Sequence, residues 1–399
     1  MMTGEHWKQI EAKYYMQVVR RMPMVLERAQ GAYVYDTEGN AYLDFTAGWA
    51  VLNIGHSHPE VTAAIQEQAG MILQMSNLFY TIPQLKLAQL LIDHSCMDRV
   101  FFCNSGAEAN EGACKLARKY GRLQLGGAYE IITANNSFHG RTLGMMAATG
   151  QAHYQDNWRP LMPGFVNVDY NDVGAIKRAT NEKTCAVLLE PVQGEGGVNV
   201  PDPDYFKQVR AWCDEKRLLL MMDEVQTGMG RLGTLFGYEQ FGVEPDAMTL
   251  AKGLGCGAPL GAFLCKQAYA VLEPGDHGST FGGNALTTAA GAAGAKVLIE
   301  ENWSQKGAET GKYLRSKLET LRTQHDFVTE VRGMGMLLAM QMADNRAAAV
   351  VAEAATNGLL MNAVRPNTLR FMPPLTTSRD EVDKAVTILD AVLAKVPAP

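Results

Sequence analysis

The sequence of 399 residues lacks several features that would assign a class of protein at once. It has no run of about 18 or more apolar residues, so we expect no membrane-spanning segment. It has no basic run, and its net charge of −6 does not favour binding to nucleic acid. Residues 1–15 contain no apolar core of the length that a signal peptide requires. We therefore expect a cytoplasmic protein whose partners include neither a membrane nor nucleic acid.

Motifs of metal and dinucleotide sites are also missing. The seven cysteines form no C-x-x-C pair, and most lie in apolar runs, which predicts buried thiols in a reducing compartment. His56 and His58 could be a metal pair, but no further ligand stands at a supporting spacing, so we expect no metal. Residues 228–233 match G-x-G-x-x-G, yet they neither follow a strand directly nor open a helix, as a dinucleotide site requires.

What the sequence does contain is a regular alternation of helical and apolar strand patterns after about residue 55. This alternation predicts an α/β fold with a mostly parallel sheet that is covered by helices on both faces. The predicted helices are 59–73, 83–93, 107–121 and 203–216, and the predicted strands are 99–103, 129–134, 185–190, 218–223, 246–251 and 261–265.

The two ends of the chain have a different texture. We predict a helix at 5–20 and two strands at 32–36 and 41–45, joined by a turn at 38–40. The C-terminal part has predicted helices at 284–300, 304–323, 344–357 and 378–395 and predicted strands near 329–340 and 368–372. The predicted domains are therefore 1–54 as the N-terminal segment of a small α+β domain, 55–283 as the large domain, and 284–399 as a linking helix with the rest of the small domain.

Three predicted strands end in residues that carry chemistry. Residues 218–222 run into Asp223, residues 247–251 run into Lys252, and another strand ends at the small-residue turn and helix start of 104–110. Each has an ordinary alternative: a loop acid, a surface lysine and a plain helix N-cap. Taken together they fit pyridoxal phosphate (PLP), which needs a lysine amine for its aldehyde, a carboxylate beside its ring nitrogen and a cradle of donors for its phosphate.

Seven motifs in order also carry a family resemblance. The sequence resembles the class III aminotransferases, PLP enzymes of fold type I, along nearly its whole length, and within them it is most similar to acetylornithine aminotransferases. The resemblance implies a large PLP-binding domain with a sheet of the seven-stranded type. The motifs are NSGAEANE (104–111), SFHGRT (137–142), EPVQGEGG (190–197), DEVQTGMGR (223–231), LAKGLG (250–255), HGSTFGGN (277–284) and LRFMPPL (369–375).

The resemblance implies a cofactor role for each matching residue. Lys252 would form a Schiff base with PLP and then move the substrate proton, and Asp223 would pair with the ring nitrogen. Phe138 would stack on the ring, and Thr280 of a second subunit would contact the phosphate, which implies a homodimer with shared active sites. The cofactor residues implied in this way are Ser105, Gly106, Ala107, Phe138, Asp223, Glu224, Val225, Gln226, Lys252 and Thr280.

Substrate contacts are implied by the same resemblance. Arg141 matches the arginine that holds the α-carboxylate, and Ser279 matches a substrate-contacting position. Arg370 matches a second arginine, which Glu195 pairs with in one half-reaction and releases in the other. Without the family, Glu195 could be a solvated loop acid and Arg370 a member of a surface ion pair. Trp49 is expected to form a wall of the substrate pocket.

The choice of amino donor depends on two positions. Val19 and Trp49 stand where ornithine aminotransferases have tyrosines that grip the ornithine carboxylate, which argues against free ornithine. We therefore expect transfer of the terminal amine of N2-acetylornithine to 2-oxoglutarate. The alternatives are 4-aminobutyrate or another ω-amino acid, or N-succinyl-diaminopimelate, as donor. A PLP racemase, mutase or decarboxylase, or a binding protein without activity, are the alternatives from other classes.

Overall fold

The computed structural model describes residues 4–399, and its largest element is a seven-stranded sheet. The strand order is β4-β10-β9-β8-β7-β5-β6, and every neighbouring pair is parallel except those made by β10, which is antiparallel to both β4 and β9. This arrangement confirms the predicted α/β fold with a mostly parallel sheet. The strands are β4 (Arg99–Cys103), β5 (Glu130–Ala134), β6 (Phe165–Val168), β7 (Thr184–Leu189), β8 (Leu219–Asp223), β9 (Ala247–Leu250) and β10 (Gly261–Cys265).

Helices cover both faces of this large sheet, and the side chains of β8 show how the two cores divide. Leu219 and Met221 belong to the core cluster beneath α5 (Gly106–Gln124). Leu220 and Met222 belong to the cluster on the opposite face, because successive strand residues point to opposite sides. The opposite cluster contains residues of α3 (Pro59–Ala69), α4 (Ile82–Asp93), α9 (Tyr205–Lys216) and α10 (Ala285–Glu300).

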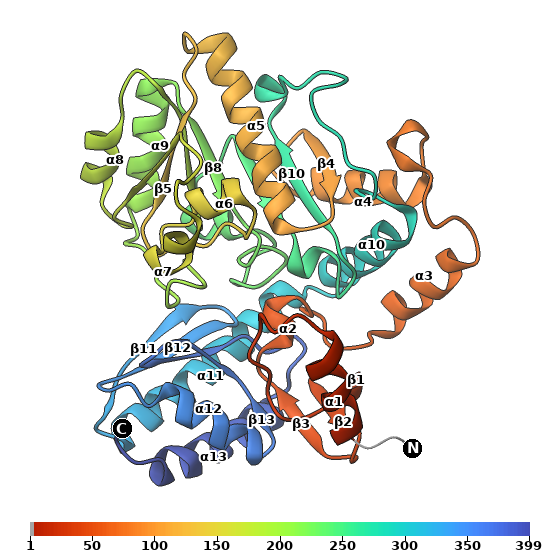
Figure 1. Ribbon diagram of the computed structural model, residues 1–399, viewed down its shortest axis with the longest axis vertical. Coiled ribbons are helices and arrows are strands. Elements are labelled where there is room, and N and C mark those ends of the chain that lie inside the picture. Colours follow the sequence, from red (N-terminus) through yellow and green to blue (C-terminus); the bar gives the residue numbers. More distant parts are fainter. Residues whose placement is uncertain (1–3) are drawn as a thin grey trace.

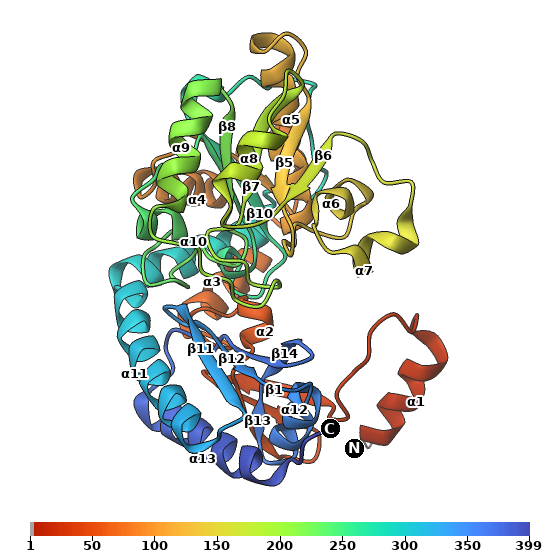
Figure 2. The same ribbon diagram turned by 90° about the vertical axis from the view of Figure 1, so that its left-hand side faces the viewer.

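Three shorter helices complete the large-sheet part of the molecule. They are α6 (Leu143–Ala148), α7 (Ala152–Gln155) and α8 (Val173–Ala179). Figure 2 shows α6 and α7 on the side of the sheet away from α9. α6 and α7 belong to the segment between β5 and β6. The same segment carries the predicted residues Phe138 and Arg141.

Two four-stranded sheets lie below the large sheet in Figure 1 and combine both ends of the chain. In the first, β1 (Leu26–Gln30), β2 (Tyr33–Asp36) and β3 (Ala41–Asp44) are joined by β13 (Leu359–Leu360), which pairs in parallel with β3. The second has the order β11-β12-β15-β14. Its strands and the helices beside it are β11 (Val328–Met334), β12 (Leu337–Met342), β14 (Asn362–Arg365), β15 (Thr368–Phe371), α11 (Trp303–Gln324), α12 (Ala347–Thr356) and α13 (Arg379–Lys395).

One core cluster joins these C-terminal elements to the N-terminal strands, since Leu43 and Phe45 pack among residues of α11, α13 and β15. The predicted domain boundaries at 54 and 283 stay a prediction. Within residues 4–399, no helix is both long enough and apolar enough to cross a bilayer.

The predicted N-terminal helix is wrong in its length. Residues 5–20 were expected to be helical, but α1 runs only from Gly4 to Tyr14, and the chain then continues to β1 without regular structure. Figure 2 shows α1 standing apart from the sheets. Several apolar side chains after the helix end are exposed, including Val19, which is 59% exposed. Apolar residues in 15–20 therefore form no face of a helix that packs on this chain.

Candidate active site

The carboxyl ends of three large-sheet strands meet at one edge. Because β10 is antiparallel to both β4 and β9, β4 runs in the same direction as β8 and β9. The residues that follow these strands therefore converge, as expected for an open parallel sheet. Ser105, Asp223 and Lys252 line one cavity of about 440 Å³. This volume lies in the range of small-molecule sites, roughly 300–1,000 Å³.

Most residues predicted to form the site line this cavity. The loops after β5 and β7 contribute Phe138, Arg141 and Glu195 to it, beside the residues that follow β4, β8 and β9. Glu224, Ser279, Thr280, Trp49 and Arg370 do not line it. The predicted residues that line it are Ser105, Gly106, Ala107, Phe138, Arg141, Glu195, Asp223, Val225, Gln226 and Lys252.

The carboxylate of Asp223 is buried and held by three donors. Its Oδ1 accepts a hydrogen bond from the Val225 amide at 3.0 Å. Its Oδ2 lies 2.8 Å from Asn110 Nδ2 and 2.7 Å from His139 Nδ1. Asn110 is itself fixed, because its Oδ1 accepts from Thr249 Oγ1 at 2.7 Å on the neighbouring strand. These contacts set the direction in which the carboxylate faces the cavity.

Sequence reasoning missed Asn110 and His139 as site residues, although both lie inside motifs that carried the family resemblance. Asn110 lies in a helix and His139 beside a predicted aromatic residue, so neither stood out by its residue type. Both are buried polar side chains, and buried polar groups are normally hydrogen-bonded. For Asn110, the signal that could have found it is a polar residue on a helix face that otherwise consists of core residues. His139 lies in the loop after β5 and offers no such signal.

Lys252 follows β9 directly and has a strained backbone. Its φ is 45°, in the left-handed region that residues with a Cβ rarely adopt. Such strain concentrates at functional sites, where the surrounding structure maintains it. Burial lowers the pKa of the Lys252 amine, and the Arg370 charge lowers it further, against the opposing charges of Glu195, Asp223 and Glu190. The environment therefore shifts the Lys252 amine toward its neutral form, which is the form that acts as a nucleophile and base.

The start of α5 forms a donor cradle beside Asp223 and Lys252. Ser105 caps the helix, since its Oγ accepts a hydrogen bond from the Glu108 amide at 3.2 Å. The amides of Gly106 and Ala107 have no partner within the helix, because the first turn of any helix leaves such groups free. A Cβ at Gly106 would lie 2.8 Å from a methyl group of Val225, so glycine keeps this backbone accessible and close-packed. The cradle can hold an anion such as a phosphate.

Arg370 and Glu195 form an ion pair between the small sheets and the cavity. Arg370 lies on β15 and is fully buried, and its Nη1 is 2.7 Å from Glu195 Oε1 and 3.3 Å from Gln226 Oε1. Burial alone would raise the pKa of Glu195, but the charges of Arg370 and Lys252 outweigh burial and lower it. Arg370 Nη2 is buried and has no hydrogen-bond partner within residues 4–399. A substrate carboxylate that displaced Glu195 could therefore form the ion pair with Arg370 in its place.

The cavity also contains a second buried acid that the sequence analysis did not identify. Glu190 follows β7, and its carboxyl oxygens accept hydrogen bonds from the amides of Phe138 at 3.2 Å and Gly194 at 3.3 Å. Burial, followed by the charge of Asp223, raises the pKa of Glu190 well above its ordinary value. Its two contacts connect the loop that carries Phe138 to the loop that carries Glu195.

Two of the predicted residues outside the cavity have other neighbours. The buried carboxylate of Glu224 accepts from the Gly237 amide, the Tyr238 amide and Thr227 Oγ1, all within 2.9 Å, and it faces the turn after β8. Ser279 stays near the cavity, because its Oγ accepts a hydrogen bond at 3.2 Å from Asn104, which lines the cavity.

Thr280 and Trp49 are both exposed on this chain. The Thr280 carbonyl accepts a hydrogen bond from Gln74. Trp49 is 51% exposed and lies in four consecutive residues with positive φ, from Ala47 at 44° to Ala50 at 61°. A left-handed run of this kind costs free energy, about 1–2 kcal/mol for each residue with a Cβ.

These residues test whether PLP fits the cavity. A strained lysine with a lowered amine pKa, a carboxylate fixed by three donors and an unsatisfied helix start open into one space, and those are the groups that PLP requires. The part of the chain that the structure describes holds no cluster of three or more metal-ligating side chains. The fold and site together define an enzyme of the PLP-dependent class.

Comparison with known proteins narrows this class. Residues 14–393 match the family described as aminotransferase class-III, and the chain belongs to that family. It is therefore a PLP-dependent aminotransferase, as the sequence predicted.

Similar proteins cover nearly the whole chain. The acetylornithine aminotransferase of Caldanaerobacter subterraneus subsp. tengcongensis is 49% identical and covers 97% of this chain and 98% of its own. That of Methanocaldococcus jannaschii is 48% identical and covers 99% and 100%. Among solved structures, an ornithine aminotransferase from Toxoplasma gondii has a TM-score of 0.95 at 34% identity, covering 99% of this chain and 96% of that one.

Proposed function

We propose that this enzyme transfers the terminal amino group of N2-acetylornithine to 2-oxoglutarate, giving N-acetylglutamate 5-semialdehyde and glutamate in arginine biosynthesis. Curated relatives named acetylornithine aminotransferase are 43% to 50% identical along nearly the whole chain. The structural observation that carries the proposal is the pairing of the buried Arg370 with Glu195, which lines the same cavity as Arg141. Arg141 could bind the carboxylate that is present in both substrates. Arg370 would stay paired with Glu195 until a substrate with a second carboxylate binds.

The strand-end residues would hold and activate the cofactor. Bound PLP withdraws electrons from the carbon that bears the amine, which makes the proton on that carbon removable. Lys252 Nζ would accept this proton and return it, and its lowered pKa supports that role. Asp223 would keep the ring nitrogen protonated, since an opposite charge at close range favours the ionised pair. Phe138 would pack against the ring, while Ser105, Gly106 and Ala107 would bind the phosphate.

The two arginines would sort the substrates by charge. Arg141 would bind the carboxylate farther from the reacting carbon in each substrate, which is the α-carboxylate of N2-acetylornithine and the γ-carboxylate of 2-oxoglutarate, because a guanidinium can bind a carboxylate through two parallel hydrogen bonds. N2-acetylornithine has no second carboxylate, so the Glu195–Arg370 pair would stay closed in its half-reaction. 2-Oxoglutarate has one, and it would replace Glu195 on Arg370. The same cavity could then accept both substrates without an unpaired buried charge.

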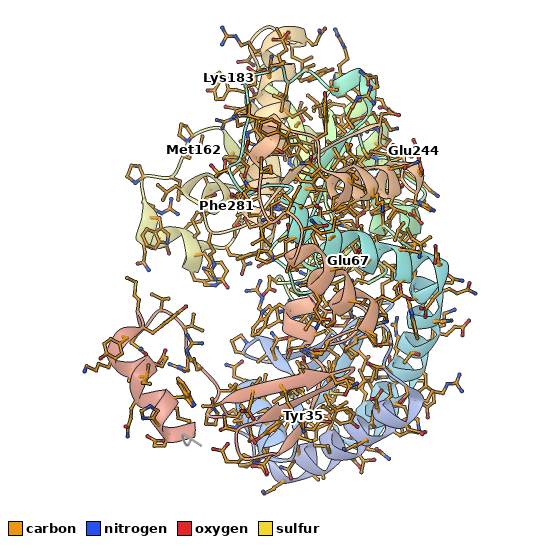
Figure 3. The ribbon with its side chains drawn as sticks, turned by 90° about the vertical axis from the view of Figure 1, so that its right-hand side faces the viewer. Tyr35, Glu67, Met162, Lys183, Glu244 and Phe281 are labelled. Carbon is orange, nitrogen blue, oxygen red and sulfur yellow. The ribbon has the colours of Figure 1, made fainter. Side chains whose placement is uncertain are left out.

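We further propose that the enzyme is a cytoplasmic homodimer with shared active sites. Residues 71–82 expose an apolar surface that includes Leu78 and Tyr80, which are 86% and 93% exposed, beside a groove of about 860 Å³ between α3, α4 and α10. Such a surface is unusual on a monomer and is typical of an interface. Phe281, labelled in Figure 3, is exposed, and the carbonyl of the neighbouring Thr280 accepts a hydrogen bond from Gln74 of this surface, which supports Thr280 reaching the phosphate of a partner. The seven free thiols support a reducing compartment.

Steady-state kinetics with competing donors tests the donor assignment. We expect kcat/KM with 2-oxoglutarate to be highest for N2-acetylornithine when ornithine, 4-aminobutyrate and N-succinyl-diaminopimelate are measured in parallel. A clear preference for 4-aminobutyrate would replace the proposed donor. A preference for ornithine would contradict the reading of Val19 and Trp49. Light scattering during gel filtration tests the dimer, and a monomeric, fully active enzyme would refute it.

A further inference from the structure

The guanidinium of Arg141 is held in an unusual way for a substrate-binding arginine. Its Cζ lies 4.0 Å from the centre of the Tyr154 ring and 5.2 Å from that of Phe138. Within residues 4–399 it makes neither a hydrogen bond nor an ion pair, whereas Arg370 is held by Glu195, Gln226 and Asn362. Among these residues, the interactions of the Arg141 guanidinium are therefore cation–π contacts rather than hydrogen bonds or ion pairs.

Aromatic contact uses a different part of the guanidinium from carboxylate binding. A ring attracts the flat face of the guanidinium through its negative π surface. A carboxylate binds in the plane, through the N–H groups along the edge. Tyr154 can thus fix the orientation of Arg141 and leave every N–H donor free. An acidic partner could fix it as well, but it would compete with the substrate for the same donors.

The short segment that carries Tyr154 is held by side-chain hydrogen bonds on both sides of this residue. It lies on α7, next to Arg141, and it does not line the cavity. Gln151 Nε2 donates to the Ser137 carbonyl at 2.9 Å, and Gln155 Nε2 donates to the Thr149 carbonyl at 2.8 Å. Both glutamines are buried. The ring of Tyr154 is therefore fixed relative to the loop that carries Phe138 and Arg141.

The phenol oxygen plays no visible part in this arrangement. Among the described residues, Tyr154 Oη makes no hydrogen bond, and its ring lies edge-on to Phe138, with centroids 5.8 Å apart and planes at 74°. Tyr154 is half-buried, so solvent reduces the attraction only in part. The ring itself, rather than the hydroxyl, carries the contact with Arg141.

We propose that Tyr154 is a positioning residue that holds Arg141 ready for the substrate α-carboxylate. This inference rests on the proposed function, because it takes Arg141 as the carboxylate-binding arginine. It predicts that losing the ring weakens recognition of the carboxylate and leaves the chemistry at the amine unchanged. Tyr154→Phe keeps the ring and is the matched control, and Tyr154→Leu removes the ring while keeping most of its bulk.

The test compares two donors that differ only in the carboxylate. N2-acetylornithine and N-acetyl-1,4-diaminobutane carry the same amine, and only the first has the α-carboxylate. The first half-reaction of PLP-loaded enzyme is followed by the absorbance of the bound cofactor, without 2-oxoglutarate. We expect Tyr154→Leu to raise the half-saturation concentration of N2-acetylornithine by about two- to fivefold, the range of a partly exposed cation–π contact. For Tyr154→Leu, the maximal rate with N2-acetylornithine and the rate with N-acetyl-1,4-diaminobutane should match those of wild type. The Tyr154→Phe variant should match wild type with both donors.

Further variants separate the two proposals. If Tyr154→Leu slows both donors equally, Tyr154 is merely structural and the inference is overturned. If Tyr154→Leu does not fold, Tyr154→Met replaces it under the same expectation. In an Arg141→Gln background, the ring substitution should have no further effect on N2-acetylornithine. An Arg141→Gln enzyme that still prefers N2-acetylornithine would overturn the carboxylate role of Arg141 and this inference with it. If Arg141→Gln loses the preference for N2-acetylornithine but Tyr154→Leu binds this donor as wild type does, only the inference about Tyr154 is overturned.

Discussion

The residues proposed to hold the cofactor and those proposed to hold the substrates are positioned in contrasting ways. The strand-end group, Ser105, Asp223 and Lys252, comes from the carboxyl ends of one sheet, so the hydrogen bonds of that sheet fix the separation of its members. The arginine group, Arg141 and Arg370, comes from a loop after β5 and from a strand of a different sheet. The first group therefore depends on one rigid element, and the second depends on how separate elements meet.

This difference matches the chemistry proposed for each group. A cofactor is the same in every turnover, and a fixed sheet edge suits it. Two substrates of different charge need a wall that changes its hydrogen bonds, and the exchangeable Glu195–Arg370 pair suits that need. The arginines themselves differ in the same sense, since one is buried with a carboxylate and the other rests on aromatic rings. Substitutions in the strand-end group should therefore affect every substrate, and those in the arginine group should be selective.

The largest effect is expected from Lys252→Ala. Without the amine no group would remain to move the substrate proton, so turnover should fall by at least about 10⁴-fold with every donor. Steady-state assays with N2-acetylornithine and 4-aminobutyrate measure this fall. A circular dichroism spectrum like that of wild type is the control for folding. An active variant would remove Lys252 from the strand-end group.

Asp223→Asn should be the next most damaging change. The amide is nearly isosteric but carries no charge, so the ring nitrogen of the cofactor would lose the partner that keeps its proton. We expect kcat to fall by about 10²–10³-fold for all donors alike, a range typical of a lost electrostatic partner in an active site. A loss confined to one donor would contradict the proposed division of the cavity. His139→Gln is the matched variant, and it should cost less, because the carboxylate keeps the Asn110 and Val225 donors.

Glu195→Gln should be selective rather than general. Without the carboxylate, Arg370 would stay charged and unpaired when a donor with one carboxylate binds, so KM for N2-acetylornithine should rise by about tenfold, the effect of roughly 1.4 kcal/mol. Glutamate, which brings a second carboxylate, should be affected less. The first half-reaction of PLP-loaded enzyme with each amino donor, followed by the absorbance of the bound cofactor without any keto acid, measures the ratio. An equal loss for both donors would place Glu195 in the strand-end group.

The sequence predicted the strand-end group better than the surroundings that hold it. Asp223 and Lys252 stood out because a buried apolar strand ends in a charge, and the pattern needs no distant contact to be recognised. Asn110 and His139 act on Asp223 across more than 80 residues of chain, and only folding brings them together. The proposed role of Tyr154 likewise depends on its contact with Arg141, which the spacing of residues in the sequence does not predict.

Secondary structure followed the same rule. The strands at 99–103 and 261–265 were predicted with their observed bounds, because each is a short, mostly apolar run that ends at a polar residue. β1, with the sequence LERAQ, was missed because its residues are mostly exposed and show no apolar alternation. The helix predicted at 59–73 ends at Ala69, where Gly70 follows and the apolar residues beyond it stay exposed. Apolar residues predict a buried element only when they pack on their own chain.

The smallest effect on activity is expected from Glu224→Gln, although Glu224 is the neighbour of Asp223 in the sequence. Asp223 faces the cavity, while Glu224 faces the turn at Gly237 and Tyr238, so kcat should stay within about twofold of wild type if the strand-end group stops at Asp223. Stability should respond instead. Burial raises the pKa of Glu224 from 4.5 to about 7, although its three hydrogen bonds lower it in part.

The sign of this stability effect follows from proton binding. Between about pH 4.5 and 7 the folded protein holds a proton on Glu224 that the unfolded chain has released, so the free energy of unfolding falls as pH rises. The loss through this group is at most about 3 kcal/mol, from roughly 1.4 kcal/mol per pKa unit. Urea unfolding at several pH values should therefore show a steeper decline for wild type than for Glu224→Gln across that window. Parallel curves would mean that Glu224 is ionised throughout, and a large loss of kcat would extend the strand-end group beyond Asp223.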